Sequence, residues 1–353
     1  MPSVPTPFDA VHIGARVVVR SRLAPAGEAP HDGPSMTDTV GTLVARDATR
    51  VVVATRHGDV SIHLDRIVAA KEIPPRPSRR GAAHLAPTVS DLQRISGPSW
   101  GALEREHLGD WELRASAGYT QRGNSVLPGG DPGIPLTDAV DAIERWYAVR
   151  GLPARVQLGG PIGFDPAGDP LGAELLRRNW SVGSLTLCLT APTERIASAD
   201  PGGADVIVSA DAGPEWLEAH ATTRSGAGTP AAVAVITGSP RHLFGQIRPG
   251  GGLSQKLGLR DADAAGTTPI ALARLGIAHG WAGLGAVWTH PAYRGRGHAA
   301  HLTARLAAAA REDGIHLMHL QVEADNATAL ALYERLGFDQ HSSYVYLTAP
   351  GGN

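Results

Sequence analysis

The feature that most constrains this chain is an apolar run followed by a glycine-containing turn and an alanine-rich segment. Residues 284–288 form the apolar run and predict a strand, which Pro291 ends. Residues 298–311 place apolar side chains at helical spacing and predict a helix. The first amide groups of a helix lack partners inside it, and the helix dipole favours an anion beside them. A strand, a glycine turn and a helix start therefore predict an anion site suited to phosphate.

The turn has the pattern Arg-x-x-Gly-x-Ala, formed by Arg294, Gly297 and Ala299. Gly295 and Gly297 allow the backbone to curl inward, and Arg294 and Arg296 can add charge-assisted hydrogen bonds. The turn has neither the Gly-Lys-Ser/Thr of a P-loop nor the Gly-x-Gly-x-x-Gly of a dinucleotide site. It resembles the pyrophosphate loop of the GNAT superfamily of N-acetyltransferases, which bind acetyl-coenzyme A. For this stretch alone, an ordinary glycine-containing strand-to-helix turn is the alternative.

A second GNAT signature follows at residues 325–338. It closely resembles the family pattern Asn-x-x-Ala-x-x-Leu-Tyr-x-x-x-Gly-Phe, with Asn326, Tyr333 and Phe338 in the matching places. Its distance from the arginine-glycine turn also matches the family. Two motifs in this order and spacing favour the family far more strongly than either alone. The whole layout resembles an actinobacterial GNAT group described as histone-acetyltransferase-like.

Composition bounds the class of protein. The chain has 353 residues, enough for two or three domains, and its net charge of −2 gives no strong attraction to nucleic acid or membranes. Its single cysteine, Cys188, lies in an apolar run, which predicts a buried, inert thiol and no intramolecular disulfide. We see neither a signal peptide nor an apolar run of membrane length, so we expect a cytoplasmic protein. The high glycine, alanine, proline and arginine content is typical of a GC-rich bacterial source.

The chain is predicted to contain three units. Short β-type runs over residues 8–73 predict a small all-β, SH3-like barrel. Residues 82–190 and 205–348 form a second and a third unit, with segments 73–80 and 191–204 as linkers. The barrel is rich in arginine, which fits either a basic binding face or a solvated surface. The interspersed aspartates favour the solvated surface.

The second and third units repeat one order of elements: strand, turn, helix, strand, helix, strand. The earlier copy lacks the motif, because its turn at 126–135 has no Arg-x-x-Gly-x-Gly/Ala pattern and its prolines remove amide donors. Leu175 stands where the later copy has Tyr333. The expected fold class is therefore an α/β (α+β) GNAT fold, a mixed central sheet with flanking helices, as a degenerate and an intact copy. Only the unit at 205–348 is expected to bind the cofactor.

Three local expectations complete the assignment of elements. Thr137 is predicted to cap a helix through its hydroxyl. Residues 121–126 are predicted to form a strand. Residues 249–268 are glycine-rich, polar and without periodicity, and predict a long loop.

The resemblance to GNAT enzymes implies which residues hold the cofactor. The strand before the loop contacts the pantetheine arm through its backbone, and the loop amides hold the pyrophosphate with arginines as charge partners. The implied residues are Val287, Trp288, Thr289, Arg294, Gly295, Arg296, Gly297, His298, Ala299, Ala300 and Asn326. The position of Asn326 is equally explained by a helix N-cap.

The resemblance also places Tyr333 near the cofactor sulfur, where its hydroxyl can protonate the leaving thiolate. Core packing is the alternative role for this tyrosine. Many family members carry glutamate at the strand position that is Gln321 here, and glutamine cannot accept the amine proton. Glu323 lies two residues on, on the same side of the strand, and is our candidate base. His319 lies two residues earlier on that side.

Three more histidines are near in sequence, and a proton relayed through water is a further alternative to Glu323. They are His279, His290 and His316.

We therefore expect an acetyl-CoA-dependent N-acetyltransferase in which a primary amine attacks the thioester directly within a ternary complex. The acceptor is a protein lysine, an N-terminus or a small-molecule amine. No metal, membrane or nucleic-acid substrate is expected, and the oligomeric state stays open. Two alternatives remain: an acyltransferase for a small amine, resembling mycothiol synthase, and an acetyl-CoA-sensing protein without turnover. The glutamine at position 321 keeps the sensing alternative open.

Overall fold

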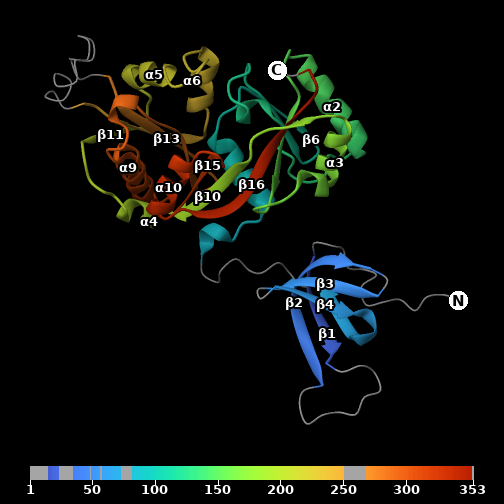
Figure 1. Cartoon of the computed structure of the whole chain (residues 1–353). Coiled ribbons are helices and arrows are strands. Elements are labelled where there is room, and N and C mark those ends of the chain that lie inside the picture. Colours follow the sequence, from blue (N-terminus) through green and yellow to red (C-terminus); the bar gives the residue numbers. More distant parts are fainter. Residues whose placement is uncertain are drawn as a thin grey trace. The chain divides into compact units, whose positions relative to one another are not determined.

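The computed structural model describes residues 15–23, 35–47, 49–55, 58–72, 82–249 and 268–351. The chain divides into two compact units, Met1–Arg80 and Gly81–Asn353 (Figure 1). The predicted loop at 249–268 falls almost wholly outside the described residues. No helix among the described residues is both long enough and apolar enough to span a bilayer.

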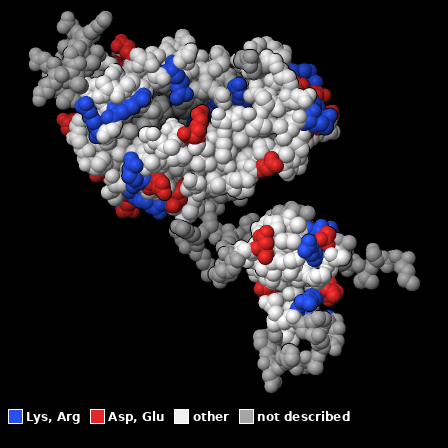
Figure 2. All heavy atoms as spheres, in the orientation of Figure 1, with Lys and Arg blue, Asp and Glu red and all other residues white. Residues whose placement is uncertain are grey.

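Within its described residues, the first unit is a five-stranded antiparallel sheet in the order β4-β3-β2-β1-β5. Its strands are β1 (Arg16–Arg22), β2 (Met36–Arg46), β3 (Arg50–Thr55), β4 (Gly58–His63) and β5 (Ile67–Glu72). Alternate valines and leucines, such as Val17, Leu43 and Val53, fill its core. Arginines pair with neighbouring aspartates, as Arg20 does with Asp38 at 2.7 Å, and Figure 2 shows both charges mixed on its surface.

Within its described residues, the second unit contains a nine-stranded mixed sheet in the order β11-β12-β13-β14-β15-β10-β16-β8, with β9 paired to β16. Its strands are β8 (Arg155–Gly160), β9 (Ser181–Val182), β10 (Thr186–Pro192), β11 (Val206–Ser209), β12 (Arg241–Ile247), β13 (Ala271–Ala278), β14 (Trp281–Thr289), β15 (Leu317–Glu323) and β16 (Asp339–Thr348). The β14–β15 pair is parallel and its neighbours are antiparallel. A separate hairpin joins β6 (Glu104–Leu108) to β7 (Trp111–Ala115). The predicted mixed sheet is confirmed.

Helices pack against the sheet at the β13–β15 end and at the β8–β16 end (Figure 1). They are α1 (Val89–Ser96), α2 (Leu136–Ala148), α3 (Pro170–Arg177), α4 (Thr193–Ser198), α5 (Pro214–Ala221), α6 (Pro230–Thr237), α9 (His298–Glu312) and α10 (Ala327–Leu336). One apolar cluster joins α9 and α10 to β13, β14 and β15. A second cluster joins α2 and α3 to β7, β8 and β16. These two cores correspond to the two predicted GNAT-like copies.

The two copies share one sheet. β10, from the earlier copy, lies between β15 and β16, and β16 pairs with β8 on its other side. A parallel bridge between Val126 and Val156 in the earlier copy repeats the parallel pairing of Leu284 with Leu320 in the later one. The repeat inferred from sequence is thus visible in the register of the strands, whereas the boundary between 190 and 205 stays a prediction.

Two local expectations were wrong. Thr137 does not cap α2, because that helix begins at Leu136, after Pro135, and has no side-chain cap. Residues 121–126 do not form a strand, because Arg122–Asn124 is a 3-10 turn. The Asn124 side chain stabilises that turn by accepting from the Ser116 amide at 2.8 Å and donating to the Thr120 carbonyl at 2.8 Å.

The predicted linker at 191–204 contains the helix α4. Ile196 in this helix is fully buried in the core beside α9. The Thr193 hydroxyl donates to the Ile315 carbonyl at 2.8 Å, which fixes the start of the helix to the chain before β15. Tertiary contacts therefore order a segment that we had predicted to be a linker.

Candidate functional site

The site begins where β14 separates from β15. Their parallel pairing ends at Leu284 and Leu320 among the described residues. On its other side β14 bulges, since its register with β13 shifts and Ala286 has a left-handed φ of 51°. Residues 285–289 are only half-buried. The backbone amide and carbonyl groups at the end of β14 are therefore not paired with β15 and border the gap between the two strands.

The glycine-containing turn before α9 has the predicted form. A short 3-10 helix, Pro291–Tyr293, follows β14, and then Gly295 and Gly297 take left-handed φ values of 74° and 80°. Gly297 is the N-cap of α9 and provides no side chain to cap it. The amides of the first turn of α9 are thus free of an intramolecular cap and lie at the positive end of the helix dipole.

Two arginines flank these amides. Arg294 Nε donates to the Thr289 carbonyl at 3.2 Å, and Arg296 lies with its guanidinium 5.3 Å from the ring centre of Tyr293. Neither arginine forms an ion pair within the described part of the chain, and both are exposed. His298 Nε2 is buried without a partner among the described residues, and burial, aided by Arg296, lowers the His298 pKa. The turn therefore carries uncompensated positive charge.

Tyr333 and Asn326 lie on α10. Tyr333 is buried in the cluster that also contains Val287, with its ring 5.7 Å from that of Phe338. Burial raises the pKa of Tyr333 to about 12, so the hydroxyl keeps its proton at neutral pH. Asn326 Oδ1 accepts from the Ala329 amide at 3.1 Å and caps the helix. The capping interpretation of Asn326 is therefore correct, and its side-chain nitrogen remains available for a second contact.

The base candidates have contrasting surroundings. Glu323 is exposed at the end of β15. Gln321 is half-buried, and its Oε1 accepts from the Tyr344 hydroxyl at 3.3 Å. His319 is 3% exposed, and burial, together with the nearby Arg122, lowers its pKa to about 3. His319 is therefore neutral and a very weak base at neutral pH.

The remaining histidines either lie away from the gap between β14 and β15 or already accept a hydrogen bond. His279 is exposed in the β13–β14 turn, at the end of β14 that is remote from the gap, and His316 is exposed before β15. His290 Nδ1 accepts from the Ala292 amide at 3.2 Å and caps the 3-10 helix before the loop. The structure thus leaves Glu323 as the exposed carboxylate on the side of β15 that carries Gln321.

Residues that sequence reasoning did not identify cover the face of the sheet opposite α9 and α10. We call this covering layer the wall. The 3-10 helix Gly97–Ser99 and Trp100 lie flat on glycines of β13 and β14. A Cβ at Gly276 would lie 1.9 Å from the Ser99 carbonyl oxygen, and one at Gly285 would lie 3.0 Å from Trp100 Cζ3. The indole therefore covers β14 where this strand leaves β15.

Two arginines, the buried Arg274 and the half-buried Arg122, accompany this tryptophan. Arg274 lies on β13 opposite Gly285 and Arg122 lies in the turn before Ser125, with guanidinium carbons 5.2 Å and 5.3 Å from the Trp100 ring centre. Sequence reasoning missed both. An arginine in the otherwise apolar strand Ala-Leu-Ala-Arg-Leu-Gly-Ile-Ala was the one available signal, since a buried charge in a strand needs an explanation.

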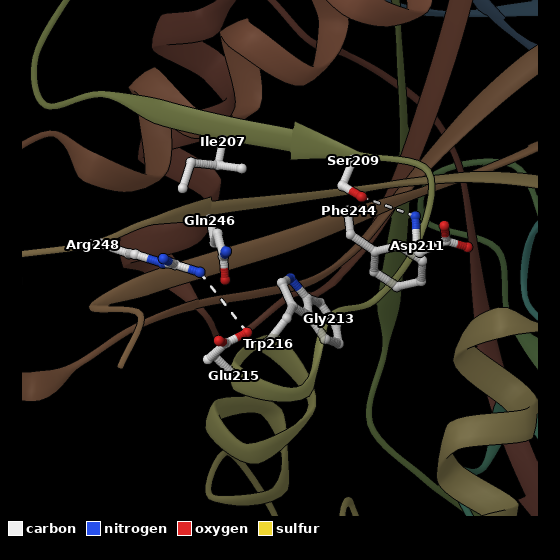
Figure 3. A pocket seen from close by; sticks show the side chains of 9 residues that line it. All are labelled: Ile207, Ser209, Asp211, Gly213, Glu215, Trp216, Phe244, Gln246 and Arg248. Atoms are coloured by element: carbon white, nitrogen blue, oxygen red, sulfur yellow. Dashed lines mark hydrogen bonds and ion pairs between the residues drawn. The ribbon is translucent and has the colours of Figure 1, made fainter. Parts of the chain in front are cut away.

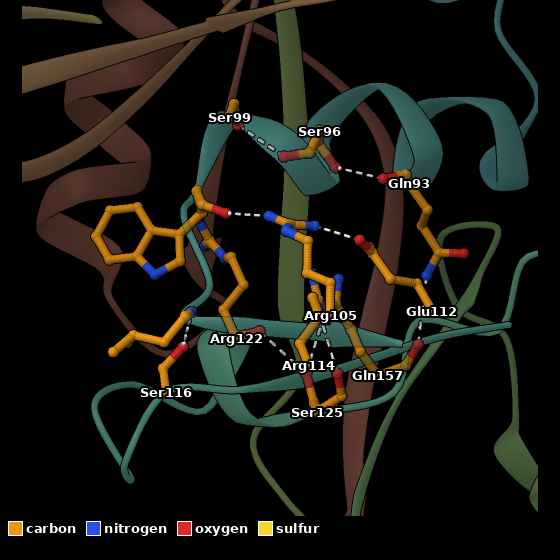
Figure 4. A network of polar contacts seen from close by, with 12 residues as sticks. Gln93, Ser96, Ser99, Arg105, Glu112, Arg114, Ser116, Arg122, Ser125 and Gln157 are labelled. Carbon is orange, nitrogen blue, oxygen red and sulfur yellow. Dashed lines mark hydrogen bonds and ion pairs between the residues drawn. The ribbon is translucent and has the colours of Figure 1, made fainter. Parts of the chain in front are cut away.

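In the earlier copy the equivalent position is closed. Gln157 follows the parallel-paired Val156, as Gln321 follows Leu320. Gln157 Oε1 accepts from Arg114 Nη2 at 3.0 Å, and Arg114 also donates to the carbonyl and hydroxyl of Ser125 (Figure 4). All three side chains are buried. In the earlier copy, a polar network whose hydrogen bonds are satisfied within the protein thus fills the position at which the strands of the later copy separate.

The described part of the chain also has a hollow of about 210 Å³ between β11, β12 and α5 (Figure 3). Trp216 and Phe244 line it, with ring centres 4.9 Å apart, and Arg248 lies 3.8 Å from Glu215 at its rim. None of the predicted site residues lines this hollow.

Comparison with known proteins identifies the family. The family model described as "Probable histone acetyltransferase Rv0428c C-terminal" matches residues 88–347. The chain belongs to this acetyltransferase family. The model described as "Rv0428c N-terminal Sm-like domain" matches residues 11–71. Family membership confirms the GNAT-type acetyltransferase expected from the two motifs and the all-β unit expected before it.

Individual relatives agree with this assignment. An "Uncharacterized N-acetyltransferase YobR" of Bacillus subtilis is 24% identical over 268 residues, which cover 73% of this chain and 97% of that protein. The "Probable histone acetyltransferase Rv0428c" of Mycobacterium tuberculosis is 34% identical over 144 residues, 40% of this chain and 42% of that one. A solved "GCN5-related N-acetyltransferase from Kribbella flavida" superposes with a TM-score of 0.52 at 19% identity, covering 75% of this chain and 96% of its own. This last likeness shows that the fold is that of GNAT proteins.

Proposed function

We propose that residues 205–348 bind acetyl-CoA and transfer its acetyl group to a primary amine at the gap between β14 and β15. The observation that carries the proposal is the uncapped start of α9 beside a strand that has left its partner. The free amides and the flanking arginines suit a pyrophosphate, and the free strand edge suits an amide-containing arm. The closed Arg114 network in the earlier copy supports one such site per chain.

The residues of this site would have the following roles. The amides from Gly295 to Ala300, with Arg294 and Arg296, would hold the pyrophosphate. The backbone of Val287, Trp288 and Thr289, with the Asn326 side-chain nitrogen, would hold the rest of the molecule. Bound acetyl-CoA supplies a thioester whose carbon–sulfur bond is exchanged for an amide bond, with the free thiol as second product.

Two proton transfers balance this exchange. The Tyr333 hydroxyl is buried and protonated, so it can give its proton to the departing sulfur. Glu323 is exposed and would accept the amine proton through a water molecule. A β14 amide near Val287 or Trp288 would stabilise the developing oxyanion. Tyr333 then regains a proton from solvent and Glu323 releases one to solvent, which restores the starting state.

A second candidate function is acetyl-CoA sensing without turnover. The observation that favours it is the neutral Gln321, held by Tyr344 and Ser96, at the strand position next to the opening. In this case the chain would bind acetyl-CoA with the same residues but would lack an effective base.

One experiment separates these possibilities. Calorimetric titration of the full chain with acetyl-CoA is expected to give one site per chain, and thiol release with a panel of amines is expected to show turnover. Binding at one site without turnover of any amine would favour sensing. A stoichiometry of two, or the absence of binding, would contradict the assignment of the site to residues 205–348.

A further inference from the structure

The wall opposite the cofactor side contains positive charge without negative charge. Arg122 and Arg274 both lie beside the Trp100 ring. Within the described residues, neither forms an ion pair with a carboxylate, and the nearest acid of the network, Glu112, pairs with Arg105 (Figure 4). Arg122 forms a side-chain hydrogen bond with Tyr344, and Tyr346 and Cys188 also act on its guanidinium group. None of these groups is a carboxylate, so the wall carries two guanidinium charges without a paired carboxylate among the described residues.

Both guanidinium groups also keep a free hydrogen-bond donor. Arg274 donates to the Ser99 carbonyl at 3.1 Å and to the Ser239 hydroxyl at 2.6 Å, but its Nε has no partner among the described residues. Arg122 Nε is likewise buried without a partner there. A buried cation without a counter-charge is costly, and an unused buried donor adds to the cost. An anion bound beside the two guanidinium groups would reduce both costs.

Arg114 shows that this lack of partners is not a general property of buried arginines in this chain. Arg114 is 1% exposed, yet its guanidinium donates to Ser125 and Gln157 from both Nε and Nη2. It is neutralised by no carboxylate in direct contact among the described residues, but its donors are satisfied by the protein itself. Arg122 and Arg274 differ in that the Nε donor of each is buried and has no partner among the described residues.

The position of the two arginines connects them with the acceptor side of the opening. Arg274 lies across from Gly285, the first β14 residue beyond the last pair with β15. Arg122 lies close enough to His319 on β15 to lower that pKa, and Tyr344, which contacts Gln321, acts on Arg122. Trp100 belongs to the apolar cluster of Trp288 and Ala286, whereas Tyr333 and α9 belong to the cluster on the other side of the sheet. The two charges therefore lie on the side of the sheet away from α9 and Tyr333, next to the residues that border the opening.

We propose that the acceptor is an amine that carries a carboxylate a few bonds from its nitrogen, an amino-acid-type acceptor, and that Arg122 binds this carboxylate. Arg122 is half-buried and has some exposed surface, so it can contact a ligand directly. Arg274 has no exposed surface and is a positioning residue, which fixes Trp100 and Ser99 and adds charge. This inference rests on the proposed function, because it names the acceptor of the same site.

The charge pattern disfavours the opposite kind of acceptor. A lysine within a basic peptide would bring further cations toward two uncompensated guanidinium groups, and like charges at an interface are strongly unfavourable. A carboxylate would meet a planar donor fork with which it forms paired, charge-assisted hydrogen bonds. The wall would thus discriminate between acceptors by charge.

The test compares matched acceptors on the full chain. Thiol release is measured with the proteinogenic amino acids and with their C-terminal carboxamides, which keep the amine and remove the negative charge. The acids are expected to have kcat/KM values at least tenfold above those of their amides. The variant Arg122→Met should lower the acid values to those of the amides, while KM for acetyl-CoA changes by less than about twofold. Arg274→Lys, which retains the charge, should preserve a preference for acids that Arg274→Met loses.

Arg114→Met is the matched control, because it also removes a buried guanidinium but one whose donors the protein already satisfies. It should lower the melting temperature and leave the acid-to-amide ratio unchanged. Equal rates for acids and amides in the native protein would overturn the inference and leave the proposed transferase intact.

Equilibrium binding covers the case in which no amine is turned over. Calorimetry with coenzyme A present then compares the acid and the amide of the same amino acid. Tighter binding of the acid, lost in Arg122→Met, would retain the anion site and reject the transferase. Equal or undetectable binding of both would overturn the inference as well.

Discussion

At the scale of single residues, Tyr333 combines a buried ring with a hydroxyl that makes no hydrogen bond within the described residues. Tyr333→Phe removes the proton donor and keeps the ring, so we expect kcat to fall about 100-fold with little change in the affinity for acetyl-CoA. Tyr293→Phe is the matched control, because that hydroxyl is also buried and unpartnered among the described residues. Steady-state thiol release measures both variants. A kcat for Tyr333→Phe equal to that of the control would remove Tyr333 as the acid.

His319 makes stability depend on pH. Burial and Arg122 lower its pKa from 6.5 to about 3, so the unfolded chain takes up this proton before the folded one does. His220 behaves alike, with a pKa lowered to about 4 by burial and then by Arg224 and Arg274. Their contribution to stability is therefore complete above about pH 6.5 and is lost as the pH falls toward 3, at up to about 1.4 kcal/mol per pH unit for each histidine.

Urea unfolding at a series of pH values from 7 to 4 measures this dependence. His319→Asn should flatten the slope by about one proton while leaving the contribution of His220. An unchanged slope would show that His319 is protonated in the folded protein.

The site residues that sequence could predict are those within one stretch of chain. The turn at 294–300 and the signature at 325–338 are local patterns, and the capping role of Asn326 follows from its own position. Trp100, Arg122 and Arg274 come from three distant segments and meet only through tertiary packing. Their joint chemistry has no local signal, so no reading of the sequence alone could have assembled it.

At the scale of elements, the start of α9 depends on Gly297, whose left-handed φ of 80° suits glycine. Gly297→Ala should cost about 1–2 kcal/mol of stability and should also weaken acetyl-CoA binding at least tenfold by moving the first-turn amides. Gly314→Ala at the other end of α9 is the control, since Gly314 has a φ of 77° and equally open surroundings. It should cost similar stability without weakening acetyl-CoA binding. Calorimetry and thermal unfolding check the pair, and equal loss of binding in both would show a merely global effect.

The position of Trp100 depends on Gly276 of β13, which has no side chain and leaves room for the Ser99 backbone. Gly276→Ala would place a Cβ 1.9 Å from the Ser99 carbonyl oxygen, a backbone atom that cannot rotate away. We expect a loss of about 2–3 kcal/mol and displacement of the indole from β14. Gly168→Ala, where a Cβ meets nothing within 4 Å, should be nearly neutral. Chemical unfolding measures the difference, and a fully stable Gly276→Ala protein would show that the 3-10 helix is not held against β13.

Elements with a strong periodic pattern could be predicted from the sequence, whereas elements fixed by distant contacts could not. The end of β14 and the helix α9 were predicted from apolar runs close to where they lie, and the predicted N-cap role of Asn326 indicated the start of α10. The 3-10 turn at Arg122–Asn124 exists because one asparagine side chain bonds to several backbone groups. The helix α4 exists because Ile196 reaches a core formed elsewhere. Both contradict local expectation for reasons that only the folded chain supplies.

At the scale of the whole molecule, the repeat in the sequence indicated two copies but not their exchange of strands. β10 belongs to the earlier copy by sequence, yet it pairs over its length with β15 of the later copy. β16 closes the later copy and contributes Val345 and Leu347 to the core of the earlier one. Alternating apolar patterns specify that these strands are buried, but they do not specify which neighbour they pair with. This part of the topology therefore needed the structure.

The exchange predicts that the second unit unfolds as one cooperative body. Separating the copies would break the β10 pairings on one side or the other and expose two sheet edges, which leaves many backbone groups unpaired. Leu158→Ala in β8 removes a 3% exposed side chain from the core of the earlier copy and should cost about 2–5 kcal/mol. Hydrogen exchange should then quicken equally in β8 and in β13, which lies in the later copy. Val149→Ala, at a position 87% exposed, should change neither. Faster exchange in β8 with β13 unchanged would show that the copies open separately, and the shared sheet would then join two domains that fold independently.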